Sequence, residues 1–164
     1  RDLVRSRGLG DVYKRQIVDN DGSLNGYGGQ GSLYLEVKSR KARWQQTNQP
    51  GFAQQKRVYQ DNENPFITGT ARYAQTEKKK DKAFVEWVPD IPETGEYAVY
   101  VSYQTLPNSV SDAKYLVFHN GGVTEFKVNQ QIGGGTWVYL GTFAFDKGKN
   151  DYGMVVLSLS LIHI

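Results

Sequence analysis

The chain of 164 residues contains no cysteine and only one methionine. Without cysteine it can form no disulfide, thiol nucleophile or thiolate metal site. It also contains no run of about 18 consecutive apolar residues, so we expect no membrane-spanning helix and no membrane insertion. What the chain has instead is many glycines and tyrosines, 18 and 11 respectively, a composition typical of strands and turns.

Groups suited to catalysis are also scarce. There are two histidines, His119 and His163. His119 precedes an Asn-Gly-Gly turn, where we expect a structural role. His163 lies in the terminal segment 159–164, which resembles translated sequencing adapter, so no other histidine and no spaced carboxylate pair is expected to form a transition-metal site with His119. The nucleophile motif G-x-S-x-G is absent. We therefore predict that the chain itself is not an enzyme and has no cofactor.

Calcium is the one metal that the sequence leaves open. The segment 19–22, Asp-Asn-Asp-Gly, is acidic. If Gly22 is aligned with the invariant glycine of an EF-hand loop, Ile17 and Gly28 fall where carboxylate ligands are required. An EF-hand is therefore not expected, while a structural calcium ion in a loop of a β-protein remains an alternative.

The two ends of the chain differ in character from the rest. Residues 1–16 and 159–164 resemble translated sequencing adapter, and we interpret 17–158 as an open-ended piece of a longer metagenomic gene whose signal peptide lies outside it. Basic residues exceed acidic ones by three within 1–16, and the two signs balance in the rest. We therefore expect no nucleic-acid partner, because nucleic-acid binding requires a surplus of basic side chains.

Hydrophobic patterning predicts an all-β fold. Residues 17–82 are loop-rich with short strands such as 33–37, whereas in 83–158 apolar runs alternate with turn residues. The hairpin signal is strongest at Asn120-Gly121-Gly122, because Asn and Gly accept the positive φ of a tight turn. The expected fold is an antiparallel β-sandwich, jelly-roll-like, with its main strands at 83–88, 97–103, 114–119, 123–130, 136–145 and 154–158.

Period-two alternation also predicts the core. Residues two apart in a strand share a face of the sheet. The expected core pairs are Val85 with Trp87, Val99 with Val101, Tyr115 with Val117, Phe126 with Val128, and Val138 with Leu140. We expect Trp87 and Trp137 to pack in the core as well.

The remaining aromatic residues are the candidate binding groups. Exposed Trp and Tyr rings stack on the flat apolar faces of sugars, while polar side chains hold the hydroxyls. The candidate ligand-binding residues are Trp44, Tyr59, Tyr73, Tyr100 and Tyr139. The alternative is that these rings are half-buried on sheet faces, as Tyr often is in β-proteins.

From residue 83 onward the sequence resembles a known family. The resemblance is carried by Trp87-x-Pro89, Gly95-x-Tyr97-x-Val99-Tyr100-Val101, Tyr115-x-Val117-x-His119, Asn129-Gln130, Trp137-x-x-Leu140-Gly141-Thr142-Phe143 and Gly148. The segment is similar to the golvesin/xanthan-lyase carbohydrate-binding-like domain of bacterial secreted proteins. The stretch 64–70 is similar to what precedes this domain in Bacteroidota-type proteins.

This resemblance implies an exported accessory module, located outside the cell or in the cell envelope. Its expected function is non-catalytic binding or targeting to polysaccharide or peptidoglycan. The alternative is a structural domain that packs on a neighbouring catalytic domain of a xanthan-lyase-like or muramoyl-alanine-amidase-like parent. The expected partners are therefore a glycan and the neighbouring domains of the same chain. Gly95 and Gly141 are expected at turns or bulges, and Asn129-Gln130 is expected to tie a loop to the sheet edge.

Overall fold

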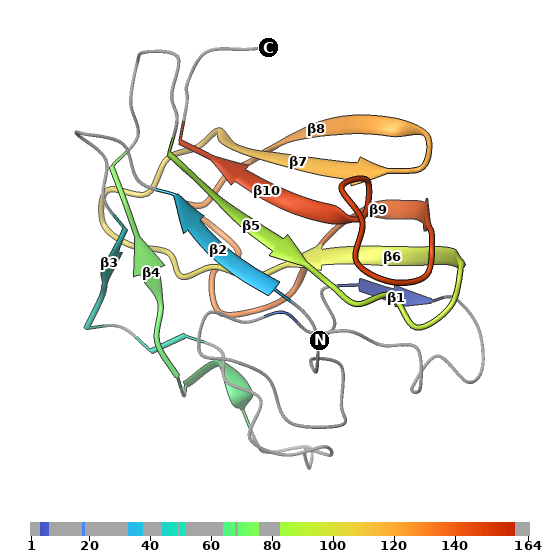
Figure 1. Ribbon diagram of the computed structural model, residues 1–164. Helices are drawn as coiled ribbons and strands as arrows, with labels where there is room; N and C mark the ends of the chain where they lie inside the picture. The colour runs from blue at the N-terminus through green and yellow to red at the C-terminus, as the bar shows by residue number, and fades with distance from the viewer. Residues whose placement is uncertain are drawn as a thin grey trace.

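The computed structural model describes residues 4–6, 18, 33–37, 44–48, 50–51, 64–67, 69–75 and 83–159 of the chain. This part contains two antiparallel β-sheets and a short two-stranded ribbon (Figure 1). Its one helical element is a single 3₁₀ turn, η2 (Pro65–Ile67), and within these ranges no helix has the length and hydropathy to cross a membrane. The prediction of an all-β, antiparallel fold is confirmed.

The larger sheet has five strands in the order β2-β5-β10-β7-β8. Its bounds are β2 (Leu33–Val37), β5 (Phe84–Val88), β7 (Ala113–His119), β8 (Gly122–Val128) and β10 (Met154–Ser158). The last strand, β10, lies in the middle and pairs with both β5 and β7. The sheet therefore joins β2 to β10, the last described strand of the chain.

The smaller sheet lies behind the larger one in Figure 1 and has the order β1-β6-β9. Its strands are β1 (Val4–Ser6), β6 (Gly95–Val101) and β9 (Val138–Phe145). The edge strand β1 belongs to the segment that we interpret as adapter, and its backbone pairs with β6. Backbone hydrogen bonds at a sheet edge accept any extended segment, so this pairing does not test the interpretation, which stays a prediction.

The core lies between the two sheets and follows the predicted alternation. Tyr97, Val99, Tyr115, Val117 and Phe145 are almost completely buried. The predicted core residues Val101 and Val128 belong to the same cluster, and the half-buried residues packed against it include Trp87, Phe126, Trp137, Val138 and Leu140. Val85 is also buried.

A β-bulge interrupts the pairing of β6 with β9. Val99 pairs with Gly141 and Tyr100 with Tyr139, so Leu140 is an extra residue on β9. A Cβ atom at Gly141 would lie 2.9 Å from Cζ of Phe143, which explains the glycine and confirms the predicted bulge. The extra residue brings Tyr139 next to Tyr100.

The hairpin between β7 and β8 is confirmed, with one correction. No non-glycine residue in the described ranges has a positive φ, so Asn120 does not adopt the conformation that the sequence suggested. The positive φ, 125°, falls on Gly122, the first residue of β8. Glycine tolerates this conformation because it has no Cβ atom.

His119 is part of this hairpin, as predicted for a structural residue. Its Nδ1 accepts a hydrogen bond from the Gly121 N–H at 3.0 Å, so the remaining ring proton of the neutral imidazole is on Nε2, 2.8 Å from Thr124 Oγ1. The ring also contacts Phe143, with centroids 4.6 Å apart. Partial burial lowers the pKa of His119 and favours this neutral form.

Candidate functional site

The described structure contains a cleft of about 810 Å³ at one end of the sandwich. One wall is the ribbon of β3 (Gln45–Gln46) and β4 (Arg72–Tyr73), which stands beside the five-stranded sheet in Figure 1. The opposite wall is the connection 102–110 that follows β6. The volume falls in the range of about 300–1,000 Å³ typical of small-ligand sites.

Aromatic rings line much of this cleft. The lining rings are Tyr34, Trp44, Tyr73, Trp87, Tyr103, Tyr115 and Trp137. Three of them follow one another across the sheet, since Trp87 lies 6.0 Å from Tyr34 and 6.5 Å from Tyr115, centroid to centroid. Gln130 Nε2 donates to Tyr115 Oη at 3.0 Å and fixes that ring at the base of the cleft. The result is a rigid apolar floor with polar groups at its margin.

The β3–β4 ribbon is attached to the sheet by one polar network. Arg72 donates to the two carboxylate oxygens of Glu36, from Nε at 2.8 Å and from Nη2 at 2.7 Å, and Nη2 lies 3.3 Å from the carbonyl oxygen of Trp44. Tyr34 donates its hydroxyl to the same carboxylate. The planar two-bond contact of Arg72 with Glu36 links β4 to β2, and the bond to Trp44 reaches the residue before β3. A planar two-bond contact is a strong geometry for such a pair.

The electrostatics of this network favour its charged form. Hydrogen bonds from Arg72 lower the pKa of Glu36, which keeps the carboxylate ionised. Burial, followed by the hydrogen bond to Glu36, raises the pKa of Tyr34 above its usual value, so the phenol keeps its proton. The network therefore holds the wall in one position at neutral pH.

The opposite wall is held by hydrogen bonds to the 129–135 turn. Tyr103 donates its hydroxyl to the Ile132 carbonyl at 2.6 Å, and Thr105 Oγ1 donates to the Gln130 carbonyl at 2.9 Å. The turn packs so closely that a Cβ atom at Gly134 would lie 2.5 Å from the Thr105 nitrogen. The Asn129-Gln130 amides were expected to tie a loop to the sheet edge. The Gln130 amide does bond to Tyr115, on the inner strand β7, whereas Asn129 Oδ1 accepts from the Gln131 N–H within the loop.

The chemistry of the lining is suited to binding hydroxyl-rich, apolar-faced molecules. Arg72 is the one charged residue among the described lining residues, and its guanidinium forms an ion pair with Glu36. The polar lining is formed mainly by amides and hydroxyls from Gln46, Thr47, Asn48, Thr70, Gln75, Ser102, Gln104, Asn108, Ser109, Gln130 and Ser158. In the described ranges no three His, Cys, Asp or Glu residues come together as metal ligands. The segment 19–22, where an EF-hand was not expected, lies outside these ranges, and a structural calcium ion elsewhere in a loop stays an alternative.

Comparison with known proteins identifies the family. Residues 59–160 match the family described as Golvesin C-terminal domain. The chain belongs to this family. It is also 33% identical over 87 residues, half of its length, to the xanthan lyase of Bacillus sp. (strain GL1). No solved structure matches it.

The similarity to the lyase is confined to a small part of that protein, because this chain spans only 9% of the lyase sequence. The family predicted from the motifs between residues 83 and 158 is confirmed, and the match begins earlier, at residue 59. The chain is therefore an accessory-type Golvesin C-terminal domain, and the lyase activity is a property of the relative.

Two of the five candidate ligand residues line the cleft of this Golvesin domain. Tyr73 is 37% exposed and donates its hydroxyl to Gln45 Oε1 at 3.0 Å. Trp44 is half-buried, packs against Ala83 and Leu159, and its indole nitrogen is buried. Tyr73 therefore presents a ring to solvent, while Trp44 mainly supports the wall.

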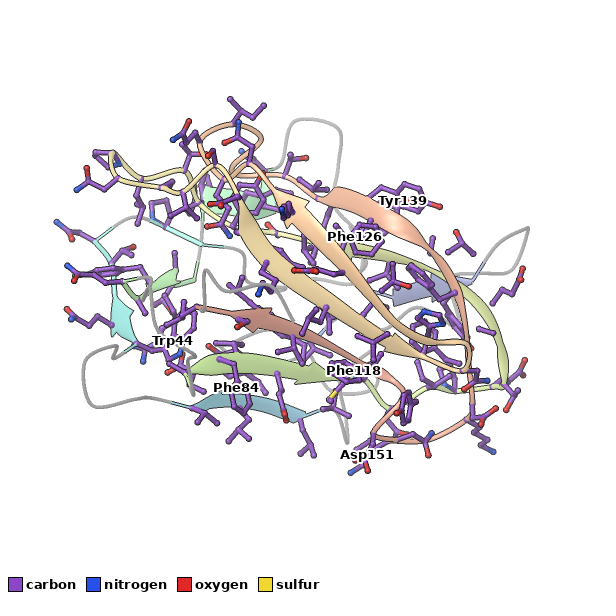
Figure 2. All side chains as sticks on the ribbon, turned by 90° about the horizontal axis from the view of Figure 1, so that it is seen from above. Trp44, Phe84, Phe118, Phe126, Tyr139 and Asp151 are labelled. Atoms are coloured by element: carbon purple, nitrogen blue, oxygen red, sulfur yellow. The ribbon has the colours of Figure 1, made fainter. Side chains whose placement is uncertain are left out.

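The other candidates lie elsewhere. Tyr100 and Tyr139 contact each other, with centroids 5.3 Å apart, on the outer face of the smaller sheet, and neither lines the cleft. Figure 2 shows Tyr139 over β9, far from Trp44. Tyr59 lies outside the described residues. The five residues thus do not form one site.

Sequence reasoning missed several cleft residues. Tyr34 alternates with the outward-facing Leu33 and Leu35, and this period-two pattern was the signal for an inward ring. Tyr103 is the last residue of the strand predicted at 97–103, where it alternates with Val99 and Val101, whereas the observed strand β6 ends at Val101. Gln104 lies in a polar connection without periodicity, so no local pattern marks it. Trp87 and Trp137 were predicted to be core residues and are packed against the core, but they also line the cleft.

Proposed function

We propose that this Golvesin C-terminal domain is a non-catalytic accessory module of a secreted protein, and that it binds polysaccharide or peptidoglycan glycan in the cleft. The observation that carries the proposal is the lining of the 810 Å³ cleft, which combines aromatic rings with amides and hydroxyls. Sugar rings have apolar faces that stack on aromatic rings and hydroxyls that pair with amides. The similarity to a xanthan lyase supports a polysaccharide as the ligand class.

Binding can be tested by retention on insoluble peptidoglycan and by retarded migration in gels that contain soluble polysaccharides. The informative variant is Tyr73→Ala, because Tyr73 lines the cleft and is exposed. Loss of one stacking ring costs about 0.5–1.5 kcal/mol, so we expect roughly a 2- to 10-fold weaker affinity.

The matched control is Tyr152→Ala, which removes a tyrosine that is 53% exposed, more than the 37% of Tyr73, and does not line the cleft. The control should bind glycan as the unmodified chain does. If the folded chain is retained on none of these glycans, or if Tyr73→Ala and Tyr152→Ala behave alike, the proposal is wrong.

A further inference from the structure

The outer face of the five-stranded sheet is largely apolar. Successive side chains of a strand point to opposite faces of the sheet, and paired residues on neighbouring strands share a face. The inner face of this sheet packs against the core. The outer face carries ten apolar residues, Leu33, Leu35, Val37, Phe84, Val88, Leu116, Phe118, Val123, Met154 and Val156, together with the polar residues Glu86, Lys114, Glu125, Lys127 and Ser158. In Figure 2, the labelled Phe84 lies on the opposite side of the molecule from Tyr139.

This face is exposed at both margins. Leu33 and Leu35 on the edge strand β2 are 53% and 50% exposed, and Val123 on the other edge strand, β8, is 48% exposed. Tyr152, 53% exposed, extends the face by an edge contact with Phe118, with centroids 6.1 Å apart. A sheet face that is exposed to water normally alternates apolar and polar residues, with the polar ones outward. Between these margins Val156 and Lys114 are only 7% and 4% exposed, so the exposed apolar residues lie at the two margins of the face. Exposed apolar area of this kind marks a contact surface.

The size of the face indicates what covers it. Five strands about 4.8 Å apart and about five residues long, at about 3.3 Å per residue, cover roughly 400 Å². A stable complex between separate proteins buries about 800 Å² on each partner, which is twice this area. Contacts between domains of one polypeptide bury about 600–1,500 Å² in total, so a face of this size is sufficient there.

We infer that the outer face of the five-stranded sheet docks onto an apolar surface of a neighbouring domain in the same polypeptide. A covalent linker supplies a high effective concentration, which compensates for the small contact area. The comparison with the xanthan lyase is consistent with this arrangement, because most of that protein lies outside the matched segment. The cleft is lined from the inner side of the sheet, so docking leaves it open.

The absence of cysteine makes the inference directly testable by labelling. Single variants Leu35→Cys and Val123→Cys are made in the 164-residue chain and in the complete polypeptide encoded by the parent gene. The matched control is Tyr139→Cys, since Tyr139 is 51% exposed on the outer face of the other sheet. The rate of reaction with a maleimide is measured for each, after thermal unfolding has verified the fold, and Leu33→Cys replaces any variant that does not fold.

We expect Leu35→Cys and Val123→Cys to react at least tenfold more slowly in the complete polypeptide than in the 164-residue chain, with Tyr139→Cys unchanged. Equal rates in both proteins overturn the inference. A dimer of the 164-residue chain at micromolar concentration, with both positions already protected, also overturns it in favour of a second copy. Glycan retention is measured separately, so failure of docking and failure of glycan binding are distinguishable.

Discussion

The sandwich of the two larger sheets and the ribbon of β3 and β4 are held in place by different interactions. Inside the sandwich, buried apolar side chains such as Val99, Val117 and Phe145 meet between the sheets. The ribbon is joined to the sheet largely through Glu36 and Arg72, with Trp44 packed on Ala83 and Leu159. We therefore expect that the cleft wall can be disturbed without unfolding the domain that carries it.

The largest expected effect comes from the sandwich. Phe145 is 1% exposed and contacts Tyr97 edge-on, with centroids 6.3 Å apart. Phe145→Ala should lower the free energy of unfolding by about 3–5 kcal/mol, because it leaves a cavity in the core. For a chain of this size that lowers Tm by about 10 °C, measured by differential scanning calorimetry. A decrease of only a degree or two would contradict the core described here.

The next effect should be confined to the ribbon. Arg72→Ala removes the two-bond contact with Glu36. The side chain of Arg72 is 29% exposed and that of Glu36 is 20% exposed. We expect a global loss of only about 1 kcal/mol, as for a partly exposed ion pair, but about tenfold weaker glycan binding. Arg72→Lys keeps the charge and loses the planar contact, and should be intermediate. If Arg72→Ala destabilises the protein as much as Phe145→Ala, the two regions are not separable.

A smaller effect is predicted for the dependence of protein stability on pH, through His119 in the β7–β8 hairpin. The pKa of His119 is lower in the folded protein than in the unfolded chain, so the unfolded state binds the proton more readily. The contribution of His119 to stability is therefore complete above the unfolded pKa of about 6.5 and is lost as the pH falls below it. Tm measured from pH 8 to pH 5 should decrease modestly. His119→Gln should reduce this dependence, and an unchanged profile would contradict the role assigned to the ring.

The smallest effect is expected at the second aromatic cluster. Tyr139→Ala removes the contact with Tyr100 and the hydrogen bond to Thr142 at 2.8 Å, both outside the cleft. Glycan affinity should change by less than about twofold, a difference of less than about 0.4 kcal/mol. A loss equal to that of Tyr73→Ala would place the glycan on the outer face of the smaller sheet instead.

Sequence patterning predicted the sandwich well because its signals are local. Strands 33–37 and 154–158 were predicted with their observed bounds, and Val99 and Tyr115 were expected in the core on alternation alone. The predicted hairpin also formed, although the positive φ is at Gly122. Each of these features depends on residues a few positions apart.

The cleft could not be predicted in this way because it depends on contacts between distant residues. Glu36 and Arg72 are 36 positions apart, and nothing near either residue marks the other as its partner. The separation of Tyr139 from Tyr73 depends on which sheet each strand joins. The only sequence signal for the bulge at Leu140 is the neighbouring Gly141. Candidate rings were thus recognised by type, while their grouping required the fold.

The most direct test of the account is titration of the ¹⁵N-labelled chain with soluble peptidoglycan and polysaccharide fragments, followed by NMR. The account predicts shifts that saturate and are concentrated at cleft residues such as Tyr34, Tyr73 and Gln104, with the amides near Tyr139 unaffected. No saturable shift with any fragment, or shifts confined to Tyr100 and Tyr139, would contradict glycan binding in the cleft.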